Sequence, residues 1–177
     1  VCTSQPLAAQ AGLDTLKKGG NVVDAIITTA TCMTVLEPTS NGLGSDAFAL
    51  YWDAKTQKLY GLNGSGFAPA ALTPEAMQAK GYTAMPDRGW ASVTIPGAPS
   101  AWAELHKRFG KMAFADCLEP AINYAENGFP VQPVVGQLWE EAVETFAPYK
   151  DKPEFQPFFA TFMKNGNPTV GYLVKLP

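Results

Sequence analysis

Residues 6–48 read PLAAQAGLDTLKKGGNVVDAIITTATCMTVLEPTSNGLGSDAF, and this stretch decides the fold, because two helical patterns and a glycine-rich loop follow one another in it. The first helix is predicted to begin at Pro6 with Ser4 as its cap. A proline fits there because the first amides of a helix have no partner within it. The pair Gly19-Gly20 predicts the end of this helix.

The second helix is predicted to begin after Asn21, whose side chain can cap it, with Asp24 in the first turn facing the positive end of the helix dipole. Pro38 stops the helix because its ring disfavours helical geometry at the preceding residue. Few polar faces remain between these limits, so we expect burial on most sides. The apolar positions are Val22, Val23, Ile26, Ile27, Ala30, Met33 and Leu36.

The loop Ser40–Asp46 contains two glycines and could suggest a phosphate-binding loop. Such a loop follows a strand and opens a helix, whereas this one follows a helix and opens a strand. We therefore predict a structural role, in which glycine permits positive φ angles and close backbone approach. If Asp46 is buried, its carboxylate needs hydrogen-bond donors.

The rest of the chain predicts a mixed α/β fold. A strand at Ala47–Trp52, apolar enough to be covered on both faces, and a return strand at Lys58–Leu62 form a hairpin around a turn. Beyond them we expect a short strand at Val93–Ile95, a turn at Asn165-Gly166, and helices at Pro74–Lys80, Ser100–Phe109, Phe114–Asn127, Val134–Phe146 and Phe158–Met163.

Length and composition narrow the classes of protein. A chain of 177 residues suits one domain, and a net charge of -3 gives no field that would attract nucleic acid. The longest apolar stretch, Ala25–Leu36, is too short and too rich in threonine to span a membrane. Cys2, Cys32 and Cys117 lack the spacing of a metal or redox motif, so we expect free, mostly buried thiols. Free thiols favour the cytoplasm over a periplasmic or secreted location.

A complete catalytic site is not predicted. The single imidazole, His106, lies at the edge of its helix between charged neighbours, which indicates a surface histidine and no triad. One histidine and three scattered cysteines do not form a zinc site, and we expect no metal or cofactor. The four tryptophans are expected in the core. Carboxylates are expected at helix starts or on outer faces, without an acid/base pair: Asp14, Asp24, Asp116, Glu119, Glu126, Glu140, Glu141 and Glu144.

Further segments follow in a fixed order: FALYWDAKTQKLYGLN, GSGFAPAALTPEAM, VTIPGAPSAWAELHKRFGKMAF and CLEPAINYAENGFPVQP. Together with the opening stretch they resemble the gamma-glutamyltranspeptidase family, at the N-terminal part of its large subunit. The resemblance covers Ser4 to about Pro133 and is looser beyond.

The resemblance implies part of the αββα sandwich of an N-terminal-nucleophile hydrolase, with residues 1–177 as a single partial domain. It implies a precursor that cuts itself and a threonine nucleophile on the second chain, beyond the equivalent of Pro177. This segment would then hold no catalytic residue and be inactive alone. Its partners would be a small acyl amide and the remainder of the precursor.

The segment Asn63–Pro69 departs from the family pattern. In members of the family, the corresponding segment resembles Asp-Gly-Arg-Glu-Thr-Ala-Pro. The arginine of that segment binds the α-carboxylate of a glutamyl substrate. Aligned on Gly64 and Ala68-Pro69, that arginine position is Ser65. Losing one member of a buried charge pair costs about 2 to 5 kcal/mol, or roughly 30-fold to several thousand-fold in affinity.

Ser65 therefore leaves several hypotheses open. The acyl group is not an ordinary gamma-glutamyl group, or a basic residue from elsewhere replaces the arginine, or Ser65 is a turn residue without ligand contact. Each of the first two hypotheses fits a side branch of the family that includes cephalosporin-acylase-like proteins. The function that the resemblance implies is a self-processing gamma-glutamyltransferase or amidohydrolase that cleaves gamma-glutamyl or related acyl amides. The alternative that Ser65 favours is a glutaryl or cephalosporin-type acylase with the same fold. A scaffold that has lost processing and catalysis is a third possibility.

Overall fold

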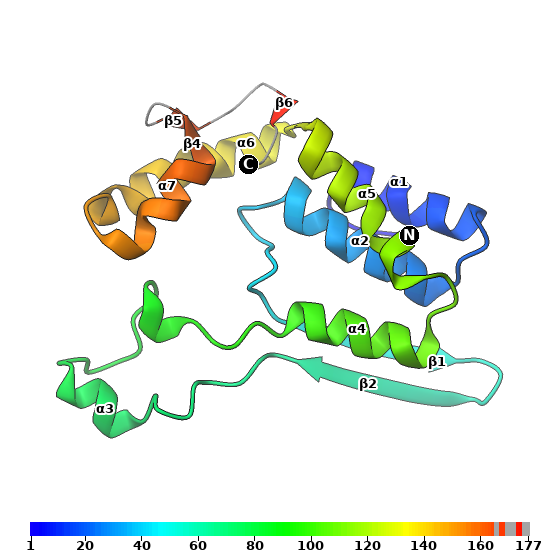
Figure 1. The fold of residues 1–177 in the computed structure, drawn as a ribbon, viewed down its shortest axis with the longest axis horizontal. Coiled ribbons are helices and arrows are strands. Elements are labelled where there is room, and N and C mark those ends of the chain that lie inside the picture. Colours follow the sequence, from blue (N-terminus) through cyan, green and yellow to red (C-terminus); the bar gives the residue numbers. More distant parts are fainter. Residues whose placement is uncertain (165–166, 169–172, 175–177) are drawn as a thin grey trace. The chain divides into compact units, whose positions relative to one another are not determined.

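The computed structural model describes residues 1–164, 167–168 and 173–174 (Figure 1). The chain divides into two compact units. Unit 1 comprises residues 1–42 and 103–177, and unit 2 comprises residues 43–102. This division leaves the single partial domain over residues 1–177 a prediction.

The core of unit 1 forms where helix α1 (Pro6–Lys17) packs on α2 (Val22–Leu36), and α2 packs on α5 (Phe114–Asn127). The two N-terminal helices approach closely at Gly12, where an added Cβ would lie 2.2 Å from Oγ1 of Thr29. The buried cluster includes Ala8, Ala11, Cys32, Met33, Leu36, Ala121, Phe129, Val135 and Trp139.

The first two helices begin where the sequence predicts, but one of their two caps differs. Of the later helices, α4 (Ala98–Phe109) begins at Ala98 and not at Ser100, and α7 (Gln156–Phe162) begins at Gln156 and not at Phe158. Asn21 caps α2 in a capping box, accepting hydrogen bonds from Val23 and Asp24 while Asp24 accepts one from the amide of Asn21. The prediction that Ser4 caps α1 is wrong. The side-chain oxygen of the buried Gln5 accepts from the first amides of α1, whereas the Ser4 hydroxyl donates to Glu37.

The threonines of α2 explain how a buried helix tolerates polar residues. The hydroxyls of Thr28 and Thr29 donate to the carbonyls of Asp24 and Ala25, so none of this polarity is left unpaired. Burial is less complete than predicted, because Val22 and Ile26 remain about half exposed or more.

Unit 1 ends in a second group of helices, in which Nε1 of the buried Trp139 donates to the carbonyl of Phe162 at 2.9 Å. The predicted turn at Asn165-Gly166 lies outside the described residues. The remaining elements are β3 (Phe129–Pro130), α6 (Pro133–Phe146), η2 (Ala147–Tyr149), η3 (Pro153–Phe155), α7 (Gln156–Phe162), β4 (Met163–Lys164), β5 (Asn167–Pro168) and β6 (Leu173–Val174). β3 pairs with β6 and β4 with β5, both antiparallel.

Unit 2 contains the predicted hairpin, in which β1 (Ala47–Asp53) pairs antiparallel with β2 (Lys58–Gly64). The expectation that the first strand is covered on both faces is wrong for the described chain. Alternate side chains point to opposite faces, and those of one face are more than half exposed. These are Phe48, Leu50 and Trp52 on β1 and Leu59 on β2, which we call the hairpin face.

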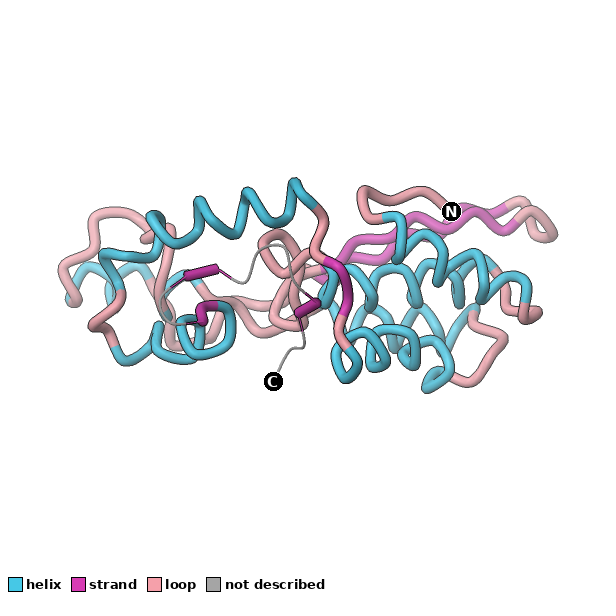
Figure 2. The backbone as a smooth tube through the Cα atoms, turned by 90° about the horizontal axis from the view of Figure 1, so that it is seen from above, coloured by secondary structure: helices cyan, strands magenta, loops and turns pink. Residues whose placement is uncertain are grey.

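The other elements of unit 2 are short. They comprise α3 (Pro74–Ala79), η1 (Trp90–Ser92) and the start of α4 (Ala98–Phe109), a helix that continues into unit 1. Most of the chain between β2 and α4 is loop (Figure 1), and Figure 2 draws loops and turns in pink. Val93–Ile95 is not assigned to a strand, although one backbone hydrogen bond joins Ile95 to Phe67.

The loop Ser40–Asp46 has a structural role of a different kind from the predicted one. Neither of its glycines has a positive φ, and Asp46 is exposed, so its carboxylate needs no buried donor. Its contribution is the carbonyl of Ser45, which accepts from the amides of Gly97 and Ala98 at the start of α4.

Within the described residues, every helix is too short or too polar to cross a bilayer.

Candidate functional site

The predicted binding residue, Ser65, lies in a turn whose shape depends on its neighbours. Its amide donates to Oδ1 of Asn63 at 3.0 Å, and Gly66 follows in the left-handed region at φ +74°. The carbonyl of Phe67 then accepts from the amide of Ile95 at 2.9 Å. The turn is therefore held against the segment that leads into α4.

Glycine is required at this contact. A Cβ at Gly66 would lie 2.0 Å from the carbonyl oxygen of Ile95, and a Cβ at Gly97 would lie 2.0 Å from that of Gly64. Real side chains do not fit at such distances, so the two backbones can approach only because these positions lack side chains. We call residues 64–67 and 95–98, with Ser45, the glycine crossing.

The two segments that contain the glycine crossing have no charged side chains. Residues 59–74 and residues 89–103 contain no Asp, Glu, Lys, Arg or His. Ser65 itself is half-buried and neutral. A replacement for the family arginine would have to come from outside these two segments.

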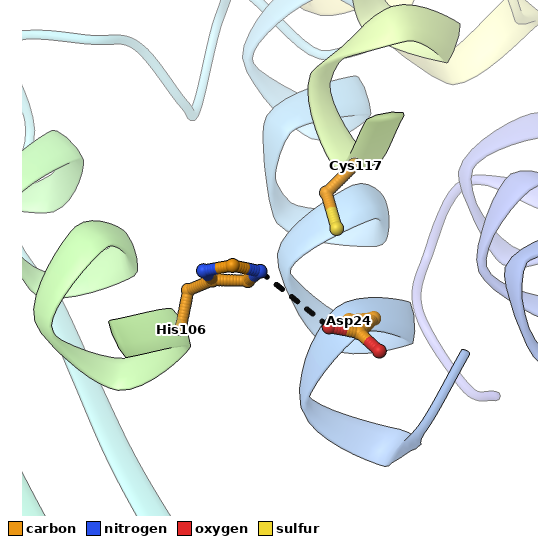
Figure 3. Close-up of side chains that lie close together, drawn as sticks. All are labelled: Asp24, His106 and Cys117. Atoms are coloured by element: carbon orange, nitrogen blue, oxygen red, sulfur yellow. Dashed lines mark ion pairs between the residues drawn. The ribbon is translucent and has the colours of Figure 1, made fainter. Parts of the chain in front are cut away.

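A second group of chemically active side chains lies in unit 1 (Figure 3). Asp24, His106 and Cys117 bring one ligand atom each within 4.8 Å of one another. The His106 imidazole points toward the carboxylate of Asp24, with Nε2 3.8 Å from Oδ1. Among the residues that the structure describes, this is the one group of three such side chains that could hold a metal.

Hydrogen bonds already occupy the atoms of this group. Asp24 is fully buried and accepts from the amides of Asn21 at 2.8 Å, Lys111 at 2.9 Å and Met112 at 3.2 Å. Nε2 of His106 lies 2.8 Å from the carbonyl oxygen of Met112. Because a carbonyl can only accept, that nitrogen carries its proton and offers no lone pair to a metal.

The Cys117 thiol of this group is not activated. Burial, and after it the neighbouring charge of Asp24, raises the pKa of Cys117, so the reactive thiolate is disfavoured. We therefore interpret the arrangement of Asp24 with Asn21, Lys111 and Met112 as a structural clasp, called the Asp24 clasp below.

The clasp corrects one prediction. His106 is only 17% exposed in its side chain, so it is not a surface histidine. Asp24 lies in the first turn of α2 as predicted, and it is also fully buried there. The loop after α4 folds back over the start of α2, which the helical pattern of either segment alone could not show. A capping position followed by a distant lysine-methionine pair gives no sequence signal for this contact.

The other cysteines and tryptophans agree in part with the sequence. Cys32 and Cys117 are free and buried, while Cys2 is free and exposed. Burial raises the pKa of the Cys32 thiol to about 12. Of the tryptophans, Trp102 and Trp139 are buried as predicted, whereas Trp52 and Trp90 are exposed. Trp52 belongs to the hairpin face, and Trp90 begins the short helix η1, none of whose residues is buried.

A groove of about 470 Å³ lies between α1 and α5. Its lining includes Asp14, Asp116 and Glu119. Hydrogen bonds from Gln10 and then Lys17 lower the pKa of Asp14, so this carboxylate stays ionised and does not act as an acid at neutral pH.

Comparison with known proteins identifies the family. Residues 8–177 match the family described as gamma-glutamyltranspeptidase. The chain is 40% identical over 142 residues to the glutathione hydrolase-like YwrD proenzyme of Bacillus subtilis (strain 168), covering 80% of this chain and 27% of that protein. It is 31% identical over 173 residues to the glutathione hydrolase proenzyme of the same organism, covering 95% and 28%.

A solved structure, the cephalosporin acylase from Bacillus halodurans, is 55% identical, with a TM-score of 0.92 over 98% of this chain and 32% of that one. The chain therefore spans less than a third of the length of these relatives. The mixed helix and strand fold is that of an N-terminal-nucleophile hydrolase in part, as predicted. The chain belongs to the gamma-glutamyltranspeptidase family.

Proposed function

We propose that the protein containing this chain is a self-processing amidohydrolase that cleaves glutaryl or other acyl amides in preference to gamma-glutamyl amides. The observation that carries the proposal is Ser65 at the place of the family's substrate-gripping arginine, in a crossing whose two segments hold no charge. Ser65 argues only against the ordinary gamma-glutamyl group, because a glutaryl group keeps a terminal carboxylate. The choice of glutaryl among the other acyl groups is supported by the 55% identity to a protein described as a cephalosporin acylase.

The hydroxyl that attacks the amide is proposed to come from residues outside this chain. The relatives are described as proenzymes, and this chain corresponds to less than a third of their length. By resemblance to the family, a threonine exposed by self-cleavage supplies both the hydroxyl and, through its own amino group, the base. The hydroxyl adds to the acyl carbonyl and the amine leaves with a proton. Water then hydrolyses the acyl-enzyme, and no cofactor takes part.

The hairpin face supports the proposal that the rest of the precursor is the partner of this chain. Its four large apolar side chains, Phe48, Leu50, Trp52 and Leu59, are each more than half exposed. A contiguous apolar surface of this kind is the expected mark of an interface. We propose that a second layer from the remainder of the precursor covers it, as the αββα plan requires. The free thiols support a cytoplasmic location for the assembled protein.

The proposal is tested with the full-length precursor. After expression, a denaturing gel shows whether it separates into two fragments. The processed protein is then assayed with gamma-glutamyl-p-nitroanilide and glutaryl-p-nitroanilide. Faster hydrolysis of the glutaryl compound is expected. A clear preference for the gamma-glutamyl compound would instead assign a gamma-glutamyltransferase activity, with another cation replacing the arginine.

A non-catalytic scaffold is the second candidate, and the same gel separates it from an enzyme. A precursor that remains one band and hydrolyses neither compound would support the scaffold. Two fragments together with hydrolysis would exclude it.

A further inference from the structure

The glycine crossing has a property that the loss of the arginine alone does not explain. Phe67, two residues after Ser65, is 81% exposed, the highest value among the large hydrophobic side chains of the described chain. Ile95, which is joined to Phe67 by a backbone hydrogen bond, is 54% exposed. Two exposed apolar side chains therefore lie close to Ser65 in sequence or in space, on two backbone segments that are joined by a hydrogen bond.

The backbone geometry of the glycine crossing requires glycine at position 66. A side chain at position 66 would meet the carbonyl oxygen of Ile95, and the φ of +74° disfavours any residue except glycine. The family's glutamate at this position cannot be accommodated on the present backbone. Gly66 thus excludes a charge from the centre of the turn and leaves Ser65 and Phe67 as the side chains that flank it.

A ligand group bound at such a surface should be uncharged. An α-carboxylate or a terminal carboxylate placed here would lose its water without gaining a cation, because residues 59–74 and 89–103 supply none. An apolar group would instead gain from contact with Phe67 and Ile95, since burial of apolar surface is favourable.

We propose that the acyl group recognised at the glycine crossing is uncharged and apolar, such as an arylacetyl group, and that Phe67 determines this specificity by direct contact. This rests on the proposed function, because it assumes that Ser65 borders the acyl-binding site. It goes beyond that function by excluding glutaryl as well as gamma-glutamyl groups from the preferred substrates.

The test compares the p-nitroanilides of phenylacetic acid, glutaric acid and gamma-glutamic acid as substrates of the full-length, processed protein. Wild type is expected to show its highest kcat/KM with the phenylacetyl compound. Phe67→Ala should lower that value about tenfold or more, because a lost apolar contact in a specificity pocket has at least this effect. Values for the other two compounds should change much less. Phe67→Leu should retain most of the preference.

A matched control is Met85→Ala, since Met85 is also an exposed apolar residue of unit 2 but lies outside both uncharged segments. It should leave all three rates unchanged. An equal fall with all three substrates in Phe67→Ala would overturn the inference, because it would show that Phe67 packs against the rest of the precursor. A wild-type preference for the glutaryl compound would also overturn it while leaving the proposed function intact.

Failure of the proposed function has a different signature. A precursor that stays intact and hydrolyses none of the three compounds refutes both the proposed function and the inference about the acyl group. A precursor that divides into two fragments but hydrolyses none of them refutes the acyl class named here while retaining self-processing.

Discussion

The buried Asp24 anchors the loop after α4 to the start of α2, and we expect its removal to destabilise unit 1. In Asp24→Ala, the amides of Asn21, Lys111 and Met112 lose their acceptor at once. A hydrogen bond to a charged group contributes about 1.5 to 3 kcal/mol, and water can replace part of each lost bond because these amides are only partly buried. The helix cap, worth about 1 kcal/mol, is weakened as well.

With water replacing part of each of the three bonds, these contributions predict a loss of about 3 to 5 kcal/mol in the free energy of unfolding of unit 1. Asp24→Asn should lower the free energy of unfolding by a smaller amount, because the amide oxygen of asparagine still accepts a hydrogen bond. Part of the loss remains, since the NH₂ group of asparagine would face a backbone donor. Glu119→Gln, which changes an exposed carboxylate on α5, serves as the control and should stay within about 0.5 kcal/mol of wild type.

The assay is hydrogen exchange of the full-length protein, read at residues 109–112 and at the start of α2. Asp24→Ala should raise the exchange rates of the Lys111 and Met112 amides far more than Glu119→Gln does. If the free energy of local opening falls by less than about 1 kcal/mol, the clasp does not anchor this loop and the reasoning is refuted.

Three further predictions follow from single contacts. Gly66→Ala should destabilise unit 2 by at least about 1 kcal/mol in thermal or chemical unfolding, because alanine at a positive φ is strained and its Cβ would meet the carbonyl of Ile95; unchanged stability would show that the crossing is loosely held. At pH 8, iodoacetamide should modify Cys2 rapidly and Cys32 only after unfolding, as burial raises the pKa of Cys32 to about 12; equal labelling in mass spectra of the native protein would contradict this. Asn21→Ala should cost about 1 to 2 kcal/mol through loss of the cap, measured by urea unfolding, and Asn21→Asp should recover most of it.

Local signals predicted the helices and the hairpin well. Asn21 and Asp24 form the capping box that their spacing indicates, and Pro38 follows the end of α2 at Leu36. Such features depend on neighbouring residues and are readable from a short segment. Gln5 was missed because glutamine is an uncommon cap, and its role depends on burial against the rest of unit 1.

Features that depend on distant residues could not be predicted. His106 becomes part-buried because the loop at residues 110–112 folds onto Asp24, more than eighty positions earlier in the chain. Trp52 is a large apolar residue of the kind usually found in a core, yet no segment among the described residues covers its side chain. For the candidate site, the sequence identified Ser65 but not the close backbone contact between Gly66 and Ile95, which needs coordinates.

The central claim is that this chain supports a nucleophile carried by a second fragment of the same precursor. The most direct measurement is N-terminal sequencing of the fragments that the purified full-length protein forms on incubation, together with hydrolysis of an acyl p-nitroanilide by each fragment alone and by the mixture. We predict a second fragment that begins with threonine and hydrolysis only when both fragments are present. Hydrolysis by the isolated 177-residue chain would contradict the account.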